Sequence, residues 1–399
     1  MPDAEPAVEV RQPISDVATG EMMESKSRWP LKIAALGMSA LLTVGFINNE
    51  RLTNYAWLAK ANLEHVVGEA PDPSSFDYLD QYKVGNGLFT NDLTGDYTKI
   101  WPHSQALSAL HILSLIPGHS SEYEAEFQLS LKASDSYWAE ATDTTRAGYN
   151  ASLNSTNFGS PERYVDDNLW MGLIHMQEFK ANRDQAQLER AEQIFDLALR
   201  QWDEQNGGIF WQVQWPDAAD HTRAMVSNAP AVQLGADLYR QTGNKDYLPK
   251  IEEIFNWMLQ HKDEPAGVFN DHIRDDETYD LSKYTYVQGV AIGAMTEMSQ
   301  IMPDKYSLQD AVDLANITLD QLSHGALLGN PEFDAILYRN LLEITGPYNH
   351  PGFTKRVLKS LQTTVDNLPK SPKELLEFVG TIQLRAMLAV PESERDKLF

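Results

Sequence analysis

From residue 50 to its C-terminus, this chain carries the apolar spacing of packed α-helices almost without interruption. In the clearest segment, Glu189–Trp202, apolar side chains recur every three or four positions and form one stripe. No strand-length run of alternating apolar and polar residues competes with these patterns, so the sequence predicts an all-α fold. Twelve helices are expected, at Leu52–Val67, Pro102–Ile116, Glu122–Trp138, Asp167–Phe179, Glu189–Trp202, Asn228–Thr242, Tyr247–His261, Val287–Ile301, Leu308–Leu322, Glu332–Glu343, Thr354–Leu368 and Lys373–Leu388.

The connections between these helices alternate between short and long. The turn at Gly243 is tight, whereas segments 140–165, 203–227 and 262–284 are long, polar and rich in aromatic residues. This alternation favours a closed ring of six helical hairpins in one domain, residues 50–399, with function on the long-loop face. A helical solenoid is the alternative architecture, but the sequence contains no fixed-period repeat to support it.

The N-terminal region differs from the rest in composition. Residues 1–30 are acidic, contain proline and have no apolar period, which predicts a disordered tail. Residues 31–48 are apolar and follow basic residues, which predicts an uncleaved signal anchor with the tail in the cytoplasm. The domain would then be extracytoplasmic and attached to the cell membrane, or it would be secreted. The alternatives are a cleaved signal peptide, because the run is short for a span, and a buried first helix.

Charge and composition exclude several classes of partner. The net charge of -25 opposes nucleic acid or an anionic membrane surface as the main partner, whereas a neutral glycan remains compatible. The 9 Trp, 16 Tyr and 14 Phe suit a site that stacks sugar rings, although a large core also uses them. The absence of cysteine rules out disulfides and thiolate metal sites without restricting the compartment.

Two adjacent carboxylates, Asp166 and Asp167, stand where a long polar loop runs into a helix. A helix start favours negative charge, but two like charges so close cannot both ionise freely. We therefore expect the pKa of one carboxyl group to rise while the helix end lowers the other. One carboxylate and one carboxylic acid are what glycoside hydrolysis needs. The alternative is a helix-capping Asp with a solvated neighbour.

Four further segments begin helices, or precede them, on the same expected face. Each has a structural alternative: Trp101 could be core, Asn228 a helix cap, and Gly207–Gly208 a turn. His103 and His272 lack metal-ligand spacing, so we predict no metal site. A serine-nucleophile elbow, a P-loop and a dinucleotide fingerprint are not found. The four segments are Tyr97–His103, Asn206–Trp211, Ser227–Pro230, and Asp271–His272 with Tyr284–Gly289.

Together and in this order, these segments resemble glycoside hydrolase family 76, the endo-α-1,6-mannanases, over roughly residues 55–345. The resemblance implies an (α/α)6 barrel, which agrees with the helix count, and cleavage of α-1,6-mannan with retention. One departure stands out, because Val287 occupies a position where the family usually has Asn. The motifs that carry the resemblance are Tyr164–Trp170, Gly207–Trp211, Asn228–Pro230, Tyr286–Gly289 and Phe333–Leu341.

The resemblance also implies roles for single residues. Asp166 would be the nucleophile and Asp167 the general acid/base, with no cofactor. Retention also agrees with the short separation expected for neighbouring carboxylates. The rivals are a transglycosylase of the same fold, an anchored non-catalytic glycan-binding protein, and a sugar epimerase that relies on His bases. Substrate contacts are expected from Trp101, Asn168, Trp211, Asn228, Asp271, Tyr286 and Gln288.

Overall fold

A computed structural model describes residues 76–91, 95–118, 120–142, 146–153, 162–214, 220–369, 372 and 374–398. The predicted tail at 1–30, the apolar run at 31–48 and the helix expected at Leu52–Val67 lie outside the described residues. Within the described part, no helix is both long enough and apolar enough to cross a bilayer. The membrane anchor therefore stays a prediction.

Eleven α-helices fall within the described residues, and each corresponds to one of the predicted segments. They share one compact unit of the chain, Thr53–Phe399. The largest shift in a boundary occurs at α4, which ends five residues earlier than expected, at Ala133 rather than Trp138. The helices are α3 (Ile100–Ser114), α4 (Ser120–Ala133), α5 (Val165–Asn182), α6 (Gln185–Leu199), α7 (Met225–Thr242), α8 (Leu248–Gln260), α9 (Thr285–Ile301), α10 (Leu308–Ser323), α11 (Pro331–Glu343), α12 (Pro351–Asp366) and α13 (Leu375–Ala389).

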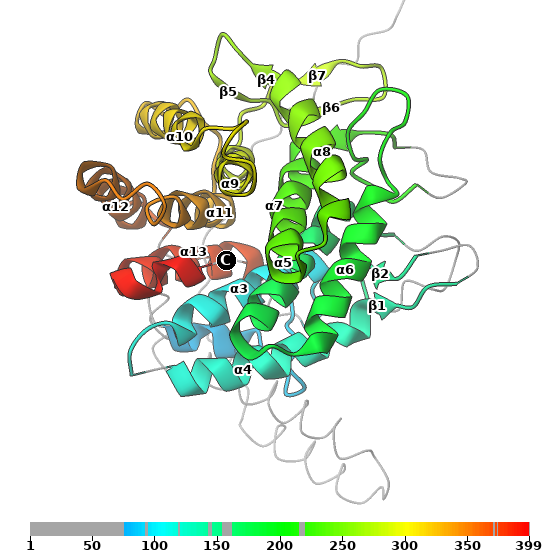
Figure 1. Ribbon diagram of the computed structural model, residues 1–399. Coiled ribbons are helices and arrows are strands. Elements are labelled where there is room, and N and C mark those ends of the chain that lie inside the picture. Colours follow the sequence, from blue (N-terminus) through cyan, green and yellow to red (C-terminus); the bar gives the residue numbers. More distant parts are fainter. Residues whose placement is uncertain are drawn as a thin grey trace, which may run out of the picture. The chain divides into compact units, whose positions relative to one another are not determined.

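Six of these helices form a closed inner ring. In chain order, α3, α5, α7, α9, α11 and α13 each pack against the next, and α13 returns to pack against α3. The colours of Figure 1 follow this ring from the cyan α3 to the red α13 beside it. The intervening helices α4, α6, α8, α10 and α12 pack on the ring from outside. This two-layered arrangement of helical hairpins is an (α/α)6 barrel, as the sequence predicted.

Burial separates the two layers in the way that their sequences indicate. The inner helix α3 is buried along nearly its whole length, whereas the outer helix α6 buries only one stripe. Glycines let the inner helices approach closely. A Cβ atom on Gly289 would lie 2.7 Å from the Cα atom of Leu337, and one on Gly380 would lie 2.3 Å from the backbone nitrogen of Glu332.

The long connections carry short antiparallel strands that the sequence analysis did not predict. Each strand is two residues long, so its apolar pattern is too short to detect. The strands β4 to β7 gather at the top of Figure 1. They are β1 (Trp138–Ala139) with β2 (Gly148–Tyr149), β4 (Lys262–Asp263) with β5 (Val268–Phe269), and a sheet of β3 (Arg223–Ala224), β6 (His272–Ile273) and β7 (Tyr279–Asp280).

Candidate active site

The N-terminal turns of all six inner helices surround one cavity of about 880 Å³. The positive ends of six helix dipoles therefore point toward the same space, which favours negative charge there. The long loops complete the walls, so the cavity opens on the face where the sequence predicted function. The helix residues at the cavity include Trp101 from α3, Asp166 and Asp167 from α5, Val226 from α7, Tyr286 from α9, Phe333 from α11 and Leu376 from α13.

The carboxylate pair belongs to the first turn of α5. Tyr164, in extended conformation, occupies the N-cap position, and Val165 is the first helical residue. Asp166 and Asp167 follow inside the helix, and both line the cavity. Asp167 is only 8% exposed. Neither residue is therefore the helix cap that the simpler interpretation of the pair required.

Burial raises the pKa values of both carboxyl groups. The pKa of Asp166 rises to about 7, against hydrogen bonds from the Trp211 side chain and the backbone at the helix start. The pKa of Asp167 rises well above its usual range because of burial and the charge of Asp166, with Lys99 opposing. The expectation that the helix end would lower one pKa was wrong, because desolvation outweighs the helix-end hydrogen bonds. Asp166, which accepts those bonds, ionises first.

Aromatic rings form part of the cavity wall. The Trp101 and Phe333 rings are stacked at 6.1 Å between centroids, and Tyr286 lies 4.3 Å from Phe333. The indole Nε1 of Trp101 is buried and has no hydrogen-bond partner among the described residues. Such flat faces suit the apolar C–H faces of sugar rings.

Trp211 lies against the start of α5. Its ring packs 4.6 Å from that of Tyr164, and its carbonyl oxygen accepts a 2.8 Å hydrogen bond from the backbone N–H of Val165. The Gly207–Gly208 turn precedes it, and both glycines have positive φ angles. A Cβ atom on Gly208 would lie 2.5 Å from the Trp257 ring, so this turn requires glycine for space as well as for its backbone conformation.

Asp271 and Tyr286 meet in the cavity although they come from different elements. The Tyr286 hydroxyl donates a 2.7 Å hydrogen bond to Oδ1 of Asp271. Burial and the Asp271 charge raise the pKa of Tyr286 above its usual range. The structure thus brings together six of the predicted site residues: Trp101, Asp166, Asp167, Trp211, Asp271 and Tyr286.

The three predicted amides, Asn168, Asn228 and Gln288, do not line the cavity and are at most 1% exposed. Each sits at the fourth position of an inner helix and hydrogen-bonds the backbone of a loop residue 19 positions earlier. For Asn228, Oδ1 accepts from the Ile209 N–H at 2.8 Å and Nδ2 donates to the Ile209 carbonyl at 3.3 Å. A role in holding the loops therefore replaces the substrate contacts that we predicted for these amides.

These three anchors form a structural repeat that the sequence analysis did not detect. They occupy positions 168, 228 and 288, and their backbone partners are Tyr149, Ile209 and Phe269. In this register Val287 follows Tyr286 as Asp167 follows Asp166, but Val287 is fully buried in the core. The departure from the family pattern at Val287 therefore falls outside the cavity wall.

Several cavity residues were not predicted. Lys99, Tyr164 and Glu374 line the cavity, as does His272, whose Nδ1 donates a 2.7 Å hydrogen bond to Asp271. Lys99, Tyr164 and His272 lie in segments that the sequence analysis had already selected through Trp101, Asp166 and Asp271. Glu374 had no such signal, because α13 reaches the cavity only through closure of the ring. Among the described residues, no cluster of three or more His, Asp or Glu side chains could hold a metal ion.

A helical barrel with a carboxylate pair in the wall of an aromatic-lined cavity has the architecture of a glycoside hydrolase. The family model for glycosyl hydrolase family 76 matches residues 70–390. The chain therefore belongs to glycosyl hydrolase family 76.

Individual relatives agree with the family. Mannan endo-1,6-alpha-mannosidase DFG5 of Saccharomyces cerevisiae is 25% identical over 209 residues, which span 47% of this chain and 43% of that protein. The match thus spans less than half the length of this curated relative. A GH76 alpha-mannanase of Bacteroides thetaiotaomicron has the same fold, with a TM-score of 0.68, 17% identity, and coverage of 87% of this chain and 97% of its own.

A second solved structure is an inactive α-1,6-mannanase variant from Salegentibacter sp., in which two consecutive aspartates are replaced by asparagine. It is bound to α-1,6-mannotriose. Its TM-score to this chain is 0.65 at 18% identity, covering 84% of this chain and 99% of its own.

Proposed function

We propose that this protein is a retaining glycoside hydrolase that cleaves α-1,6-mannosidic linkages in mannan. The carboxylate pair at the start of α5 is the observation that carries the proposal. Asp166 ionises before Asp167, so near neutral pH the pair holds one carboxylate and one carboxylic acid. The names of the yeast and bacterial relatives support mannan as the substrate.

In the proposed mechanism, the Asp166 carboxylate attacks the anomeric carbon while Asp167 donates its proton to the departing glycosidic oxygen. The C–O bond to the leaving sugar breaks, and a covalent glycosyl ester forms on Asp166. Asp167, now a carboxylate, takes a proton from water as that water attacks the anomeric carbon. The ester bond breaks, the product keeps its α configuration, and both carboxyl groups return to their initial states.

The cavity supports the sugar-binding part of this proposal. The faces of Trp101, Phe333 and Tyr286 offer apolar surface to a pyranose ring. The hydrogen bond from Trp211 to Asp166 stabilises the ionised nucleophile. The aromatic residues and the catalytic pair would therefore act on the same sugar.

Transglycosylation is the second candidate. It uses the same glycosyl ester and differs only in whether water or a sugar hydroxyl attacks it. Linear α-1,6-mannan incubated with and without a labelled mannose acceptor distinguishes the two. Label in longer oligosaccharides indicates transfer, whereas unlabelled shorter fragments alone indicate hydrolysis.

The two other classes receive less support. An epimerase would need neutral histidine bases in the cavity. His103 is fully buried, contacts the Ser130 carbonyl at 3.0 Å, and has its pKa lowered to about 4 by burial. His272 does line the cavity, but its hydrogen bond to Asp271 raises its pKa and favours the protonated form over a base. A non-catalytic glycan-binding protein would gain nothing from two adjacent acids with raised pKa values, which cost stability at neutral pH. If residues 31–48 anchor the protein in the membrane, the proposed glycoside hydrolase would act at the cell surface.

The proposal is tested by incubating the full chain with unbranched α-1,6-mannan and following new reducing ends. We expect cleavage, and NMR of the anomeric protons at early times should show an α product first. Absence of cleavage at any pH from 4 to 9 would contradict the activity. A β product formed first would leave hydrolysis standing and exclude the double displacement.

A further inference from the structure

A chain of alternating charges runs from the cavity to the surface through His272. The Tyr286 hydroxyl donates to Oδ1 of Asp271, and Oδ2 of the same carboxylate lies 2.7 Å from Nδ1 of His272. On the other side of the imidazole, Nε2 lies 3.9 Å from Oδ2 of Asp280. Asp280 in turn pairs with the half-exposed Arg274. His272 is thus the link between two carboxylates, one of which faces the catalytic pair.

The sheet β3–β6–β7 holds this chain of residues in place. His272 begins β6, where it pairs with Ala224 on β3 and with Asp280 on β7. The carbonyl oxygen of Asp271 accepts a 2.9 Å hydrogen bond from the N–H of Met225, the first residue of α7. The backbone of Asp271 and His272 is therefore held by two separate segments, one at Ala224–Met225 and one at Asp280.

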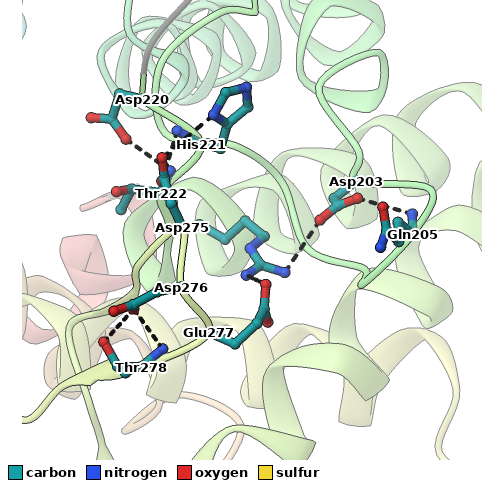
Figure 2. Close-up of polar contacts among 10 residues, drawn as sticks. Asp203, Gln205, Asp220, His221, Thr222, Asp275, Asp276, Glu277 and Thr278 are labelled. Carbon is teal, nitrogen blue, oxygen red and sulfur yellow. Dashed lines mark hydrogen bonds and ion pairs between the residues drawn. The ribbon is translucent and has the colours of Figure 1, made fainter.

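A neighbouring ion-pair cluster, shown in Figure 2, ties the tip of the β6–β7 hairpin to the preceding long loop. The guanidinium of Arg223 pairs with Asp203 and with Glu277, which has a left-handed backbone, and the Arg223 side chain is 2% exposed. The positive charge of Arg223 is thus already matched by these two carboxylates. A second histidine, His221, pairs with Asp275 on the same hairpin at 3.4 Å but is half-exposed.

The charges around His272 favour its protonated form. Hydrogen bonding to Asp271, with the charges of Asp271 and Asp280, raises the pKa of His272 above its usual value, whereas burial and Arg274 oppose this. The Asp271 charge in turn raises the pKa of Asp166. From α9, Tyr286 presents a neutral hydroxyl to Asp271, because its own pKa lies above the usual range.

We propose that His272 is a positioning residue which, as an imidazolium, orients the Asp271 carboxylate and offsets its charge beside the catalytic pair. An unpaired Asp271 charge would oppose ionisation of the Asp166 nucleophile, whereas a paired Asp271 opposes it less. His272 does not touch the reacting atoms in this role. It acts through Asp271, and it keeps Asp166 ionised at a lower pH than the carboxylate-rich cavity would otherwise allow. This inference rests on the proposed function for the identity of the nucleophile.

The variant His272→Gln tests the proposal, because glutamine has an amide N–H that can still donate to Asp271 but carries no charge. We expect the acidic limb of the kcat/KM profile on α-1,6-mannan to move to higher pH by on the order of half a unit. The matched control is His221→Gln, which removes a histidine–aspartate pair from the same hairpin outside the cavity lining. That variant should keep the wild-type profile.

A merely structural role for His272 would lower the melting temperature without moving the acidic limb. Superposition of the His272→Gln and wild-type profiles, or an equal shift in both variants, would therefore overturn the proposal. A second variant, Asp280→Asn, removes a charge that favours the imidazolium. It should lower the pKa of the His272 ring in an NMR titration, and an imidazole pKa below 6.5 in the wild type would also overturn the proposal.

A readout without substrate separates this proposal from the proposed function. The ionisation of Asp166 can be followed through its 13C-labelled carboxyl group in wild type, His272→Gln and His221→Gln. We expect its pKa to rise only in His272→Gln, and an unchanged pKa there contradicts the positioning role. Failure to cleave mannan, with this pKa shift present, would instead count against the mannanase activity alone.

Discussion

At the start of α5, the surroundings of Asp166 and Asp167 favour the state in which only one of the two side chains carries a proton. Asp167 is buried and Asp166 is half-buried beside it, so ionising both costs desolvation and repulsion, and both pKa values rise. The helix end and the Trp211 side chain offset part of this cost for Asp166. Asp167 lacks these donors and keeps its proton to higher pH, as a general acid must.

Replacing either acid by asparagine should remove most of the activity. For Asp167→Asn we expect a loss of about 10²- to 10⁴-fold in kcat, because the leaving oxygen is no longer protonated. For Asp166→Asn the loss should be at least as large, since no ester can form. Initial rates on mannan measure both, and near-wild-type turnover by either variant would show that its residue has another role.

The same substitutions should stabilise the fold at alkaline pH. Because the folded-state pKa values are raised, the stability that these carboxyl groups contribute is present below pH about 4 and is lost as the pH rises through the folded pKa. Asp166→Asn should therefore melt higher than wild type at pH 8, with a smaller difference at pH 5. Thermal unfolding at the two pH values measures this, and a larger advantage at pH 5 would contradict the raised pKa.

Trp211 should combine two functions that a pair of substitutions can separate. Trp211→Phe keeps a flat ring but loses the hydrogen bond to Asp166, so the acidic limb of the kcat/KM profile should move to higher pH. Trp211→Ala should in addition raise KM, because a stacking face is removed. A drop in melting temperature with normal mannan affinity would instead mean that Trp211 is a core residue.

At the scale of elements, the loops owe their positions to the amide anchors of the inner helices. Asn168, Asn228 and Gln288 each bind both polar groups of one residue in a long connection, which satisfies buried backbone that the short strands leave unpaired on that side. Without them the loops that carry Trp211 and Asp271 would lose a fixed point near the cavity. The repeat is therefore one of geometry, carried by one amide side chain on each of the three inner helices α5, α7 and α9.

Asn228→Ala should destabilise the protein by about 1–3 kcal/mol, because the buried N–H and carbonyl of Ile209 lose their partner. The control is Asn182→Ala at the exposed end of α5, which should cost less than about 0.5 kcal/mol. Urea unfolding of both variants measures the difference. Equal effects at the two sites would show that the anchor contributes little.

Across the whole barrel, the end opposite the cavity holds a second set of charges. The C-terminal parts of four inner helices contribute Lys180, Asp237, Arg240, Glu297 and Glu343. Arg240 pairs with both Asp237 and Glu297, and Lys180 pairs with Asp237 at 3.1 Å. Burial, and then the charge of Glu297, raise the pKa of Glu343 to about 8. With both cations and the Asp237 and Glu297 carboxylates charged, this cluster of five residues has no net charge only while Glu343 keeps its proton.

Glu343→Gln should flatten the dependence of stability on pH. In the wild type, the contribution of Glu343 is complete below the unfolded pKa of about 4.3 and is lost as the pH rises toward 8. The variant should match wild type near pH 5 and melt higher at pH 9. If the wild type were instead the more stable at pH 9, the Glu343 carboxylate would have to be favourably paired.

Local sequence patterns determined the elements and the segments of the site. A helix of this length, inner or outer, has an apolar period that can be detected in the sequence. Each of the eleven described helices could therefore be predicted. The pair Asp166–Asp167 was found because the polar loop and the helix start are both visible in sequence. The two-residue strands were missed, since a period of two cannot be established over two residues.

Only the tertiary structure decided which side chains share the cavity and what surrounds each of them. Asn168, Asn228 and Gln288 are buried and hold loop backbone through hydrogen bonds, although their motifs resemble those of a binding site. Burial also raised both pKa values in a pair for which local reasoning expected one to fall. Closure of the ring brought Glu374 into the same cavity as Asp166 across more than 200 residues of chain. Helix periodicity is a local property, whereas desolvation and neighbourhood depend on every element that packs around a residue.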